Sequence, residues 1–141
     1  MSLTNDTFGN YLIQKLIEYV SDENLAYISE VIYSDFYQIG ISPHGTRVIQ
    51  KLIECIRTSN DLEMFNETFK LYVIDLIKDI NGNHIIIKYI SKIQFPVNQF
   101  IYDIICDSYV ELATNKHGCC VIQKCLDYAA PHQKVELMKR T

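Results

Sequence analysis

The sequence contains four copies of an eleven-residue segment at a nearly constant spacing. The copies are FGNYLIQKLIE (8–18), HGTRVIQKLIE (44–54), NGNHIIIKYIS (81–91) and HGCCVIQKCLD (117–127). Their glycines, Gly9, Gly45, Gly82 and Gly118, follow one another at intervals of 36, 37 and 36 residues. A period of about 20–50 residues is typical of repeat proteins, in which each unit buries its apolar face against its neighbours. The sequence therefore predicts an array of stacked repeats.

The apolar residues of the repeated segment have the spacing of a helix. In the second copy they are Val48, Ile49, Leu52, Ile53 and Ile56, which form a stripe along one helical face and do not alternate as in a strand. Further amphipathic stretches separate successive copies, at residues 25–33 and 36–41, and again at residues 62–69 and 72–80. We therefore expect three short helices in each period.

Helix boundaries are predicted from serine and proline. Ser42 is a predicted N-cap with Pro43 in the first turn of the helix that follows. Pro96 and Pro131 are predicted in the first turns of later helices, because proline fits there without the loss of an intrahelical hydrogen bond.

The composition is that of a folded chain without a membrane span. Of 141 residues, 48% are hydrophobic and 21% charged, with five glycines and three prolines, which excludes disorder and collagen-like structure. No segment resembles a signal peptide or approaches the roughly 20 apolar residues of a span. Of the five cysteines, three lie within residues 119–125, a poor arrangement for a disulfide framework. We therefore expect reduced thiols and a cytoplasmic location.

Three positions of the repeated segment vary in a pattern. The residues after each glycine are Asn10 and Tyr11, Thr46 and Arg47, Asn83 and His84, and Cys119 and Cys120. Four residues after the first of each pair come Gln14, Gln50, Ile87 and Gln123. Residues i and i+4 share a helical face, so each repeat sets these side chains together. Amides offer donors and acceptors to a base edge, and tyrosine, arginine and histidine offer flat faces for stacking. Repeated along the array, these side chains would form a row of sites for binding single-stranded nucleic acid.

The patterns G-N-Y-x-x-Q-K, G-T-R-x-x-Q-K, G-N-H-x-x-x-K and G-C-C-x-x-Q-K resemble the RNA-reading helices of Pumilio-type (PUF) repeats over essentially the whole chain. The resemblance implies an all-α fold, a right-handed superhelical solenoid of three-helix PUF repeats similar to armadillo proteins. It also implies binding of single-stranded RNA, usually in messenger 3′ untranslated regions, with one base per repeat and repression or decay of the message. It implies no enzyme activity and no cofactor.

The resemblance also assigns bases to the four repeats. Its base-edge residues are Asn10, Gln14, Thr46, Gln50, Asn83, Cys119 and Gln123. The pair in the first repeat is expected to read uracil, and the pair in the last repeat adenine. Thr46 resembles the adenine reader, with Thr in place of the usual Cys or Ser. Asn83 resembles a uracil reader, but Ile87 cannot hydrogen-bond a base edge, so we expect relaxed specificity there. Because the family runs antiparallel to its RNA, the expected read is 5′-AUAU-3′.

The stacking residues and the lysines complete the expected surface. The resemblance assigns stacking to Tyr11, Arg47, His84 and Cys120, of which Cys120 offers the poorest face. Tyr11 interrupts the apolar stripe, so we expect it to be exposed. The aligned lysines are Lys15, Lys51, Lys88 and Lys124, and the sequence leaves open whether they contact phosphates or form a solvated face. The net charge of −4 argues against general attraction to polyanions. RNA binding depends, however, on the charge of the local binding face and not on the net charge. Many of the acidic residues lie outside the repeated segments.

The repeat boundaries are expected at 1–24 (incomplete), 25–60, 61–97, 98–133 and the start of a further repeat at 134–141, all within one partial Pumilio homology domain, 1–141. The order of the patterns resembles the second to fifth repeats of an eight-repeat domain. Since neither end has the polar cap that a solenoid needs, we expect the chain to be a piece of a longer array. Its uncapped ends are expected to self-associate.

Other functions were weighed against these expectations. A protein-binding helical scaffold is one alternative, and effector proteins could bind the outer helices, where Tyr33, Phe36 and Tyr37 gather. A second alternative is a PUF-like protein that binds RNA without sequence reading in ribosome assembly. Zinc is disfavoured, because adjacent cysteines on a helix point about 100° apart, and tetrahedral sites need convergent ligands. No nucleophile arrangement or phosphate loop indicates catalysis.

Overall fold

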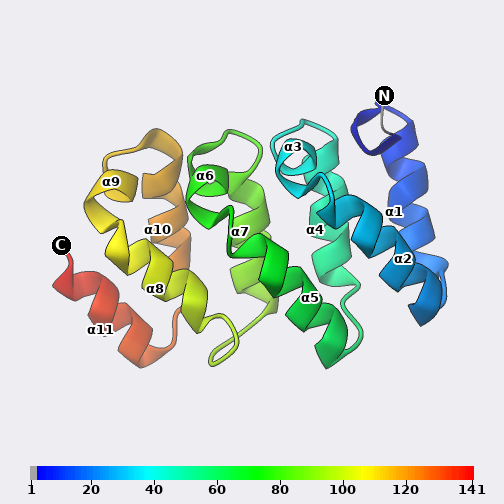
Figure 1. The fold of residues 1–141 in the computed structure, drawn as a ribbon. Helices are drawn as coiled ribbons and strands as arrows, with labels where there is room; N and C mark the ends of the chain where they lie inside the picture. Colours follow the sequence, from blue (N-terminus) through cyan, green and yellow to red (C-terminus); the bar gives the residue numbers. More distant parts are fainter. Residues whose placement is uncertain (1–2) are drawn as a thin grey trace. The chain divides into compact units, whose positions relative to one another are not determined.

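The computed structural model describes residues 3–141, and these contain eleven α-helices, one 3-10 helix and no β-strand (Figure 1). The all-α prediction is confirmed. The predicted period of three helices is confirmed as well, since two short helices precede each of the helices that carry the last three copies. No helix in this part of the chain is both long and apolar enough to cross a bilayer. The chain divides into two compact units, Met1–Tyr72 and Val73–Thr141.

Unit 1 is built around the helices of the first two copies. Its elements are η1 (Leu3–Asn5), α1 (Gly9–Tyr19), α2 (Asp22–Tyr33), α3 (Phe36–Gly40), α4 (Gly45–Glu54) and α5 (Ser59–Phe69). Helix α1 lies beside α4, α3 packs on α4, and α2 packs on α3 and α5 (Figure 1). The apolar stripe of α4 is buried, with Val48, Ile49 and Ile53 fully inaccessible. Phe36 on α3 packs against the rings of Phe65 on α5 and of Tyr72.

Unit 2 repeats this arrangement with the helices of the last two copies. Its elements are α6 (Val73–Lys78), α7 (Asn83–Lys92), α8 (Gln99–Asp107), α9 (Tyr109–Ala113), α10 (Lys116–Tyr128) and α11 (Pro131–Lys139). Helix α7 lies beside α10, α6 packs on α7 and α9 on α10, and α8 packs on α11 (Figure 1). Ile85, Ile86 and Val121 are fully buried between these helices. The helical stripe predicted from the sequence is therefore the core of both units.

Three of the four loops before the repeated helices, those before α1, α7 and α10, use a cap that the sequence analysis did not identify. Asp6 Oδ1 accepts hydrogen bonds from the backbone N–H groups of Phe8 (3.0 Å) and Gly9 (2.6 Å). Asp79 caps Gly82 and its neighbour in the same way, and Asn115 caps Gly118. The hydrogen bonds from Gly9 and Phe8 lower the pKa of Asp6 from its usual value, because they favour the charged carboxylate.

Two of the predicted helix starts are wrong. Ser42 occupies the position that Asp6 occupies in the first copy, but α4 begins at Gly45, and the Ser42 hydroxyl donates to the carbonyl of Gln38 (2.5 Å). Pro96 lies in the turn before α8 and not in its first turn, since α8 begins at Gln99. Pro131 does begin α11, as predicted.

Three of the expected repeat boundaries cut helices. The divisions after residues 24, 60 and 133 fall near the starts of α2, α5 and α11, while the division after residue 97 falls in the loop before α8. The helix starts lie two or three residues before these boundaries, because Ser21 and Thr58 act as N-caps and Pro131 opens α11. The assignment of whole repeats to these ranges remains a prediction.

Candidate functional site

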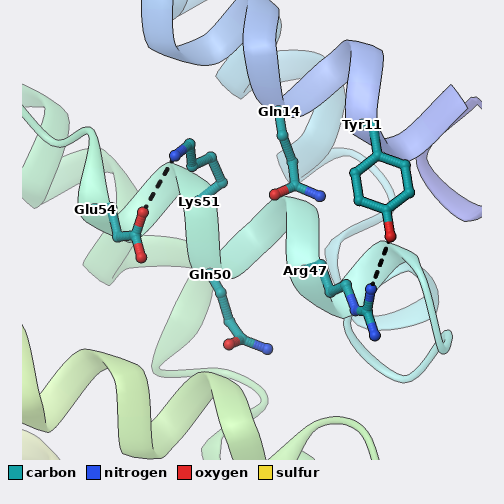
Figure 2. Close-up of a pocket in the computed structure, with 6 residues that line it drawn as sticks. All are labelled: Tyr11, Gln14, Arg47, Gln50, Lys51 and Glu54. Carbon is teal, nitrogen blue, oxygen red and sulfur yellow. Dashed lines mark hydrogen bonds and ion pairs between the residues drawn. The ribbon is translucent and has the colours of Figure 1, made fainter. Parts of the chain in front are cut away.

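In each unit, the two helices that carry the repeated segments line a hollow on the surface. In unit 1 the hollow measures about 310 Å³ and lies between α1 and α4. Its lining residues are Tyr11, Gln14, Arg47, Gln50, Lys51 and Glu54 (Figure 2). In unit 2 the hollow measures about 490 Å³ and lies between α7 and α10. It is lined by Ile80, Asn83, His84, Ile87, His117, Cys120, Gln123, Lys124 and Asp127. The variable positions of the repeats therefore gather where the paired helices meet.

Each glutamine of the row is tied to the residue one turn before it. Gln14 Nε2 donates to Asn10 Oδ1 at 3.0 Å. Gln50 donates in the same way to the Thr46 hydroxyl at 3.3 Å. Gln123 donates to Cys119 Sγ at 3.3 Å. The i, i+4 pairing predicted from the sequence is therefore present in three repeats, and in each of them it fixes the orientation of the amide. Ile87 has no polar atom with which to form such a pair.

In the first three repeats, the residue after the glycine is less accessible than the sequence implied. Asn10, Thr46 and Asn83 are 0%, 4% and 6% exposed. Asn10 Nδ2 donates to the carbonyls of Asp6 (2.8 Å) and Thr7 (3.0 Å). Asn83 Nδ2 makes the equivalent two bonds, to Asp79 and Ile80, each at 2.9 Å. Each asparagine thus ties its helix to the capping loop before it, and both amide hydrogens are occupied. The base contacts expected of these asparagines stay predictions.

The four residues assigned to stacking are all exposed: Tyr11, Arg47, His84 and Cys120. Tyr11 is 55% exposed, so its predicted exposure is confirmed. In unit 1, Arg47 Nη1 donates to the Tyr11 hydroxyl at 3.3 Å (Figure 2). This hydrogen bond holds one planar side chain of each helix at the mouth of the hollow. Flat groups in such a position can stack on a base.

The lysines of unit 1 are paired with acids, which the sequence analysis missed. Lys51 Nζ lies 3.6 Å from a Glu18 carboxylate oxygen on α1 and 3.4 Å from Glu54 on its own helix. Lys15 lies 3.5 Å from Glu18. Burial disfavours the charged form of Lys51, but the hydrogen bond that Lys51 donates to Glu54 and the charges of Glu18 and Glu54 raise its pKa overall. Lys51 therefore links α1 to α4.

The two other aligned lysines lie in unit 2. Lys88 is half-buried on α7, whereas Lys124 is exposed and lines the hollow. The expectation of phosphate contacts from the four lysines remains a prediction. The geometry favours Lys124 over Lys51 as a phosphate contact, because the ammonium of Lys51 already lies between two carboxylates.

The cysteines of α10 have separate environments. Cys119 contacts Gln123, Cys120 is exposed in the hollow, and Cys125 is fully buried, as its alignment with the apolar stripe predicted. Burial raises the pKa of the Cys125 thiol to about 12, so this thiol stays protonated at neutral pH. Within residues 3–141, no group of three or more His, Cys, Asp or Glu side chains is arranged to hold a metal ion.

Comparison with known proteins identifies the class that this fold and site define. The model of the Pumilio-family RNA binding repeat matches residues 1–32, 35–67 and 108–140. A Pumilio domain-containing protein of Schizosaccharomyces pombe is 37% identical over 134 residues, which are 95% of this chain and 20% of that protein. The chain belongs to the Pumilio family of RNA-binding repeat proteins. The predicted resemblance is confirmed.

Solved structures agree with this assignment. The Puf4 RNA binding domain bound to the HO endonuclease RNA 3′ UTR recognition sequence matches with a TM-score of 0.93 and 43% identity, over 98% of this chain and 43% of that chain. The RNA-binding domain of yeast Puf5p bound to SMX2 RNA matches with a TM-score of 0.85 and 35% identity, over 98% of this chain and 40% of that chain. The fold is thus that of a PUF repeat solenoid, as predicted. The chain spans about a fifth of the length of the curated relative and less than half of these domains.

Proposed function

We propose that this chain binds single-stranded RNA and reads its sequence with one base for each repeat. The observation that carries the proposal is the glutamine row: in three repeats a glutamine amide is oriented by its i−4 neighbour beside an exposed residue at the stacking position. Two solved relatives with these repeats hold RNA. An oriented amide next to a stacking face is what recognition of an unpaired base requires.

The orientation of the glutamines suggests how they would read a base. Because Gln14 Nε2 donates one hydrogen to Asn10, its Oε1 and its second N–H remain for a ligand. Uracil presents a donor at N3 next to a carbonyl acceptor, and adenine presents a donor at N6 next to an acceptor at N1. A glutamine amide can pair with either edge, so the residue in the first position would decide between them. The proposed read is 5′-AUAU-3′, with the last base opposite α1.

The proposal extends to the messages bound. One solved relative is bound to a 3′ UTR recognition sequence, and we propose that this chain also binds messenger 3′ untranslated regions in the cytoplasm, where it would repress or destabilise the message. The role is that of a binding protein and not of an enzyme.

Reciprocal alanine variants test the reading. Gln14→Ala is expected to reduce the preference for uracil at the last base from roughly tenfold to less than about threefold, because the variant has lost the amide that would pair with the base edge. It should leave the preference for adenine at the first base unchanged. Gln123→Ala should reduce the preference for adenine at the first base and leave the preference for uracil at the last base unchanged. Fluorescence anisotropy with single-base RNA variants measures both preferences. Equal loss at both ends from either variant would contradict reading by individual repeats.

The salt dependence of binding tests the lysines. Lys124→Gln is expected to reduce the slope of log affinity against log salt by about 0.7, the value for one single-strand phosphate contact. The matched variant Lys51→Gln should leave the slope nearly unchanged, since Glu18 and Glu54 already neutralise Lys51. Titrations at several salt concentrations give both slopes. A larger change for Lys51→Gln than for Lys124→Gln would contradict this distinction.

A further inference from the structure

Two acidic side chains stand at the C-terminal ends of the helices that line the hollow of unit 1. Glu18 lies in the last turn of α1, and Glu54 is the last residue of α4. The helix dipole disfavours negative charge at this end, so neither acid stabilises its own helix by its position. Both carboxylates instead lie close to the ammonium of Lys51, Glu18 at 3.6 Å and Glu54 at 3.4 Å. The contact that these acids share is therefore with a lysine of the hollow.

Lys15 extends this contact into a row of alternating charge. Its ammonium lies 3.5 Å from Glu18, so the row runs from Lys15 through Glu18 and Lys51 to Glu54. The two positive and two negative charges of the row cancel. Lys15 is 67% exposed and lies over the ring of Tyr19, at 5.6 Å from its centroid, whereas Lys51 lines the hollow. Lys51 is thus the cation of the row that lies at the candidate site.

The pair of Lys51 and Glu54 shares a surface with the glutamines of the site. Both side chains line the hollow between α1 and α4 together with Gln14 and Gln50 (Figure 2). The other cation of this hollow, Arg47, donates to a tyrosine hydroxyl, which carries no charge. An RNA strand that sets a base beside these glutamines also brings its phosphates to this surface, because every base is joined to a phosphate through its sugar. Lys51 is therefore near the strand, but carboxylates already hold its ammonium.

We propose that Glu18 and Glu54 restrain the affinity for RNA by holding Lys51 in ion pairs that an RNA phosphate must replace. The inference rests on the proposed function and deepens it. Carboxylates and phosphates compete for the same ammonium donor, and the two negative charges also repel the strand. A phosphate contact carries no sequence information, so the restraint lowers the affinity for every RNA alike. Binding then depends more on the contacts with the bases.

The double variant Glu18→Gln with Glu54→Gln tests the restraint in the full 141-residue chain. It is expected to bind RNA about threefold more tightly at low salt and to raise the slope of log affinity against log salt by about 0.7, the value for one single-strand phosphate contact. The gain should be the same for an RNA that contains UGUAUAUA and for its scrambled counterpart. Fluorescence anisotropy measures both affinities. Both acids are exposed, so the melting temperature should change little and controls for folding.

Two further variants show whether the gain comes from Lys51. Addition of Lys51→Gln to the double variant should abolish the gain in affinity and in slope, because no ammonium is then released. The matched control is Glu63→Gln with Glu67→Gln, which removes two exposed acids from α5, a helix that does not line the hollow. This pair makes the same change in net charge and should alter the affinity by less than about twofold, because salt screens exposed charges that lie far from the strand.

The remaining results would overturn the inference. It is wrong if the double variant binds no more tightly than the unaltered chain, if the gain survives Lys51→Gln, or if the α5 pair gives the same gain. None of these results bears on base reading, which is tested by the preference of the unaltered chain for the ordered RNA. If that preference is absent but the gain still depends on Lys51, base reading fails and the restraint stands. If the unaltered chain binds neither RNA, the proposed function and the inference both fail.

Discussion

Gly45→Ala is expected to lower the free energy of unfolding of unit 1 by about 3 kcal/mol. A Cβ atom at Gly45 would lie 2.3 Å from the carbonyl oxygen of Ile39 on α3, and this contact is with backbone that cannot move aside as a side chain can. In an ordinary helix the same change stabilises by up to about 1 kcal/mol, so the expected sign is reversed. Urea denaturation followed by circular dichroism measures the change.

Gly9→Ala is the matched control. Its Cβ would meet the Leu3 side chain and the Leu3 carbonyl oxygen at 3.0 Å, a much milder contact. We expect a loss of less than about 1 kcal/mol for this variant. If Gly45→Ala were as stable as Gly9→Ala or more stable than the unaltered chain, the close approach of α4 to α3 would be wrong.

Arg57→Ala is expected to destabilise unit 1 by about 2 kcal/mol. Arg57 follows α4 and reaches back to the end of α1, where Nη1 donates to the carbonyl of Val20 at 2.7 Å and Nη2 to those of Ile17 and Glu18 at 3.3 Å. It also pairs with Asp22 at 3.0 Å. The guanidinium therefore satisfies carbonyls that the helix end leaves without partners. Thermal unfolding measures the loss.

Two further variants isolate the cause of this effect. Arg57→Lys keeps the charge but not the planar fork, so it should restore less than half of the lost stability. Lys70→Ala removes only an exposed ion pair with Glu67 and should cost less than about 1 kcal/mol. Full rescue by lysine would mean that only the positive charge at this position stabilises unit 1, and that the hydrogen bonds to the carbonyls do not contribute.

The period of the sequence predicted the helices well, because burial of an apolar stripe follows directly from helical spacing. The same logic placed Cys125 in the core and Tyr11 on the surface. It failed at Ser42 and Pro96, where the choice between a cap and a turn depends on how the preceding helix ends. Capping loops are set by the packing of short helices such as α3 and α6, which local sequence specifies only weakly.

The candidate site was also predicted only in part from the sequence, because some of its contacts depend on how the helices pack. The i, i+4 relation between Asn10 and Gln14 was visible in the sequence, but the bonds from Asn10 to the loop carbonyls were not, since an asparagine suits a base edge and a backbone carbonyl equally. The pairing of Lys51 with Glu54 had a signal, an opposite charge three residues away. Its contact with Glu18 needed the packing of α1 against α4.

Sequence-selective RNA binding is tested most directly by fluorescence anisotropy at several salt concentrations. One labelled RNA contains UGUAUAUA, and the other has the same composition in scrambled order. We expect at least tenfold tighter binding to the ordered RNA, with a ratio that persists as salt rises, because phosphate attraction weakens with salt while base contacts do not. Equal affinity for the two RNAs at every salt concentration would contradict base reading by this chain.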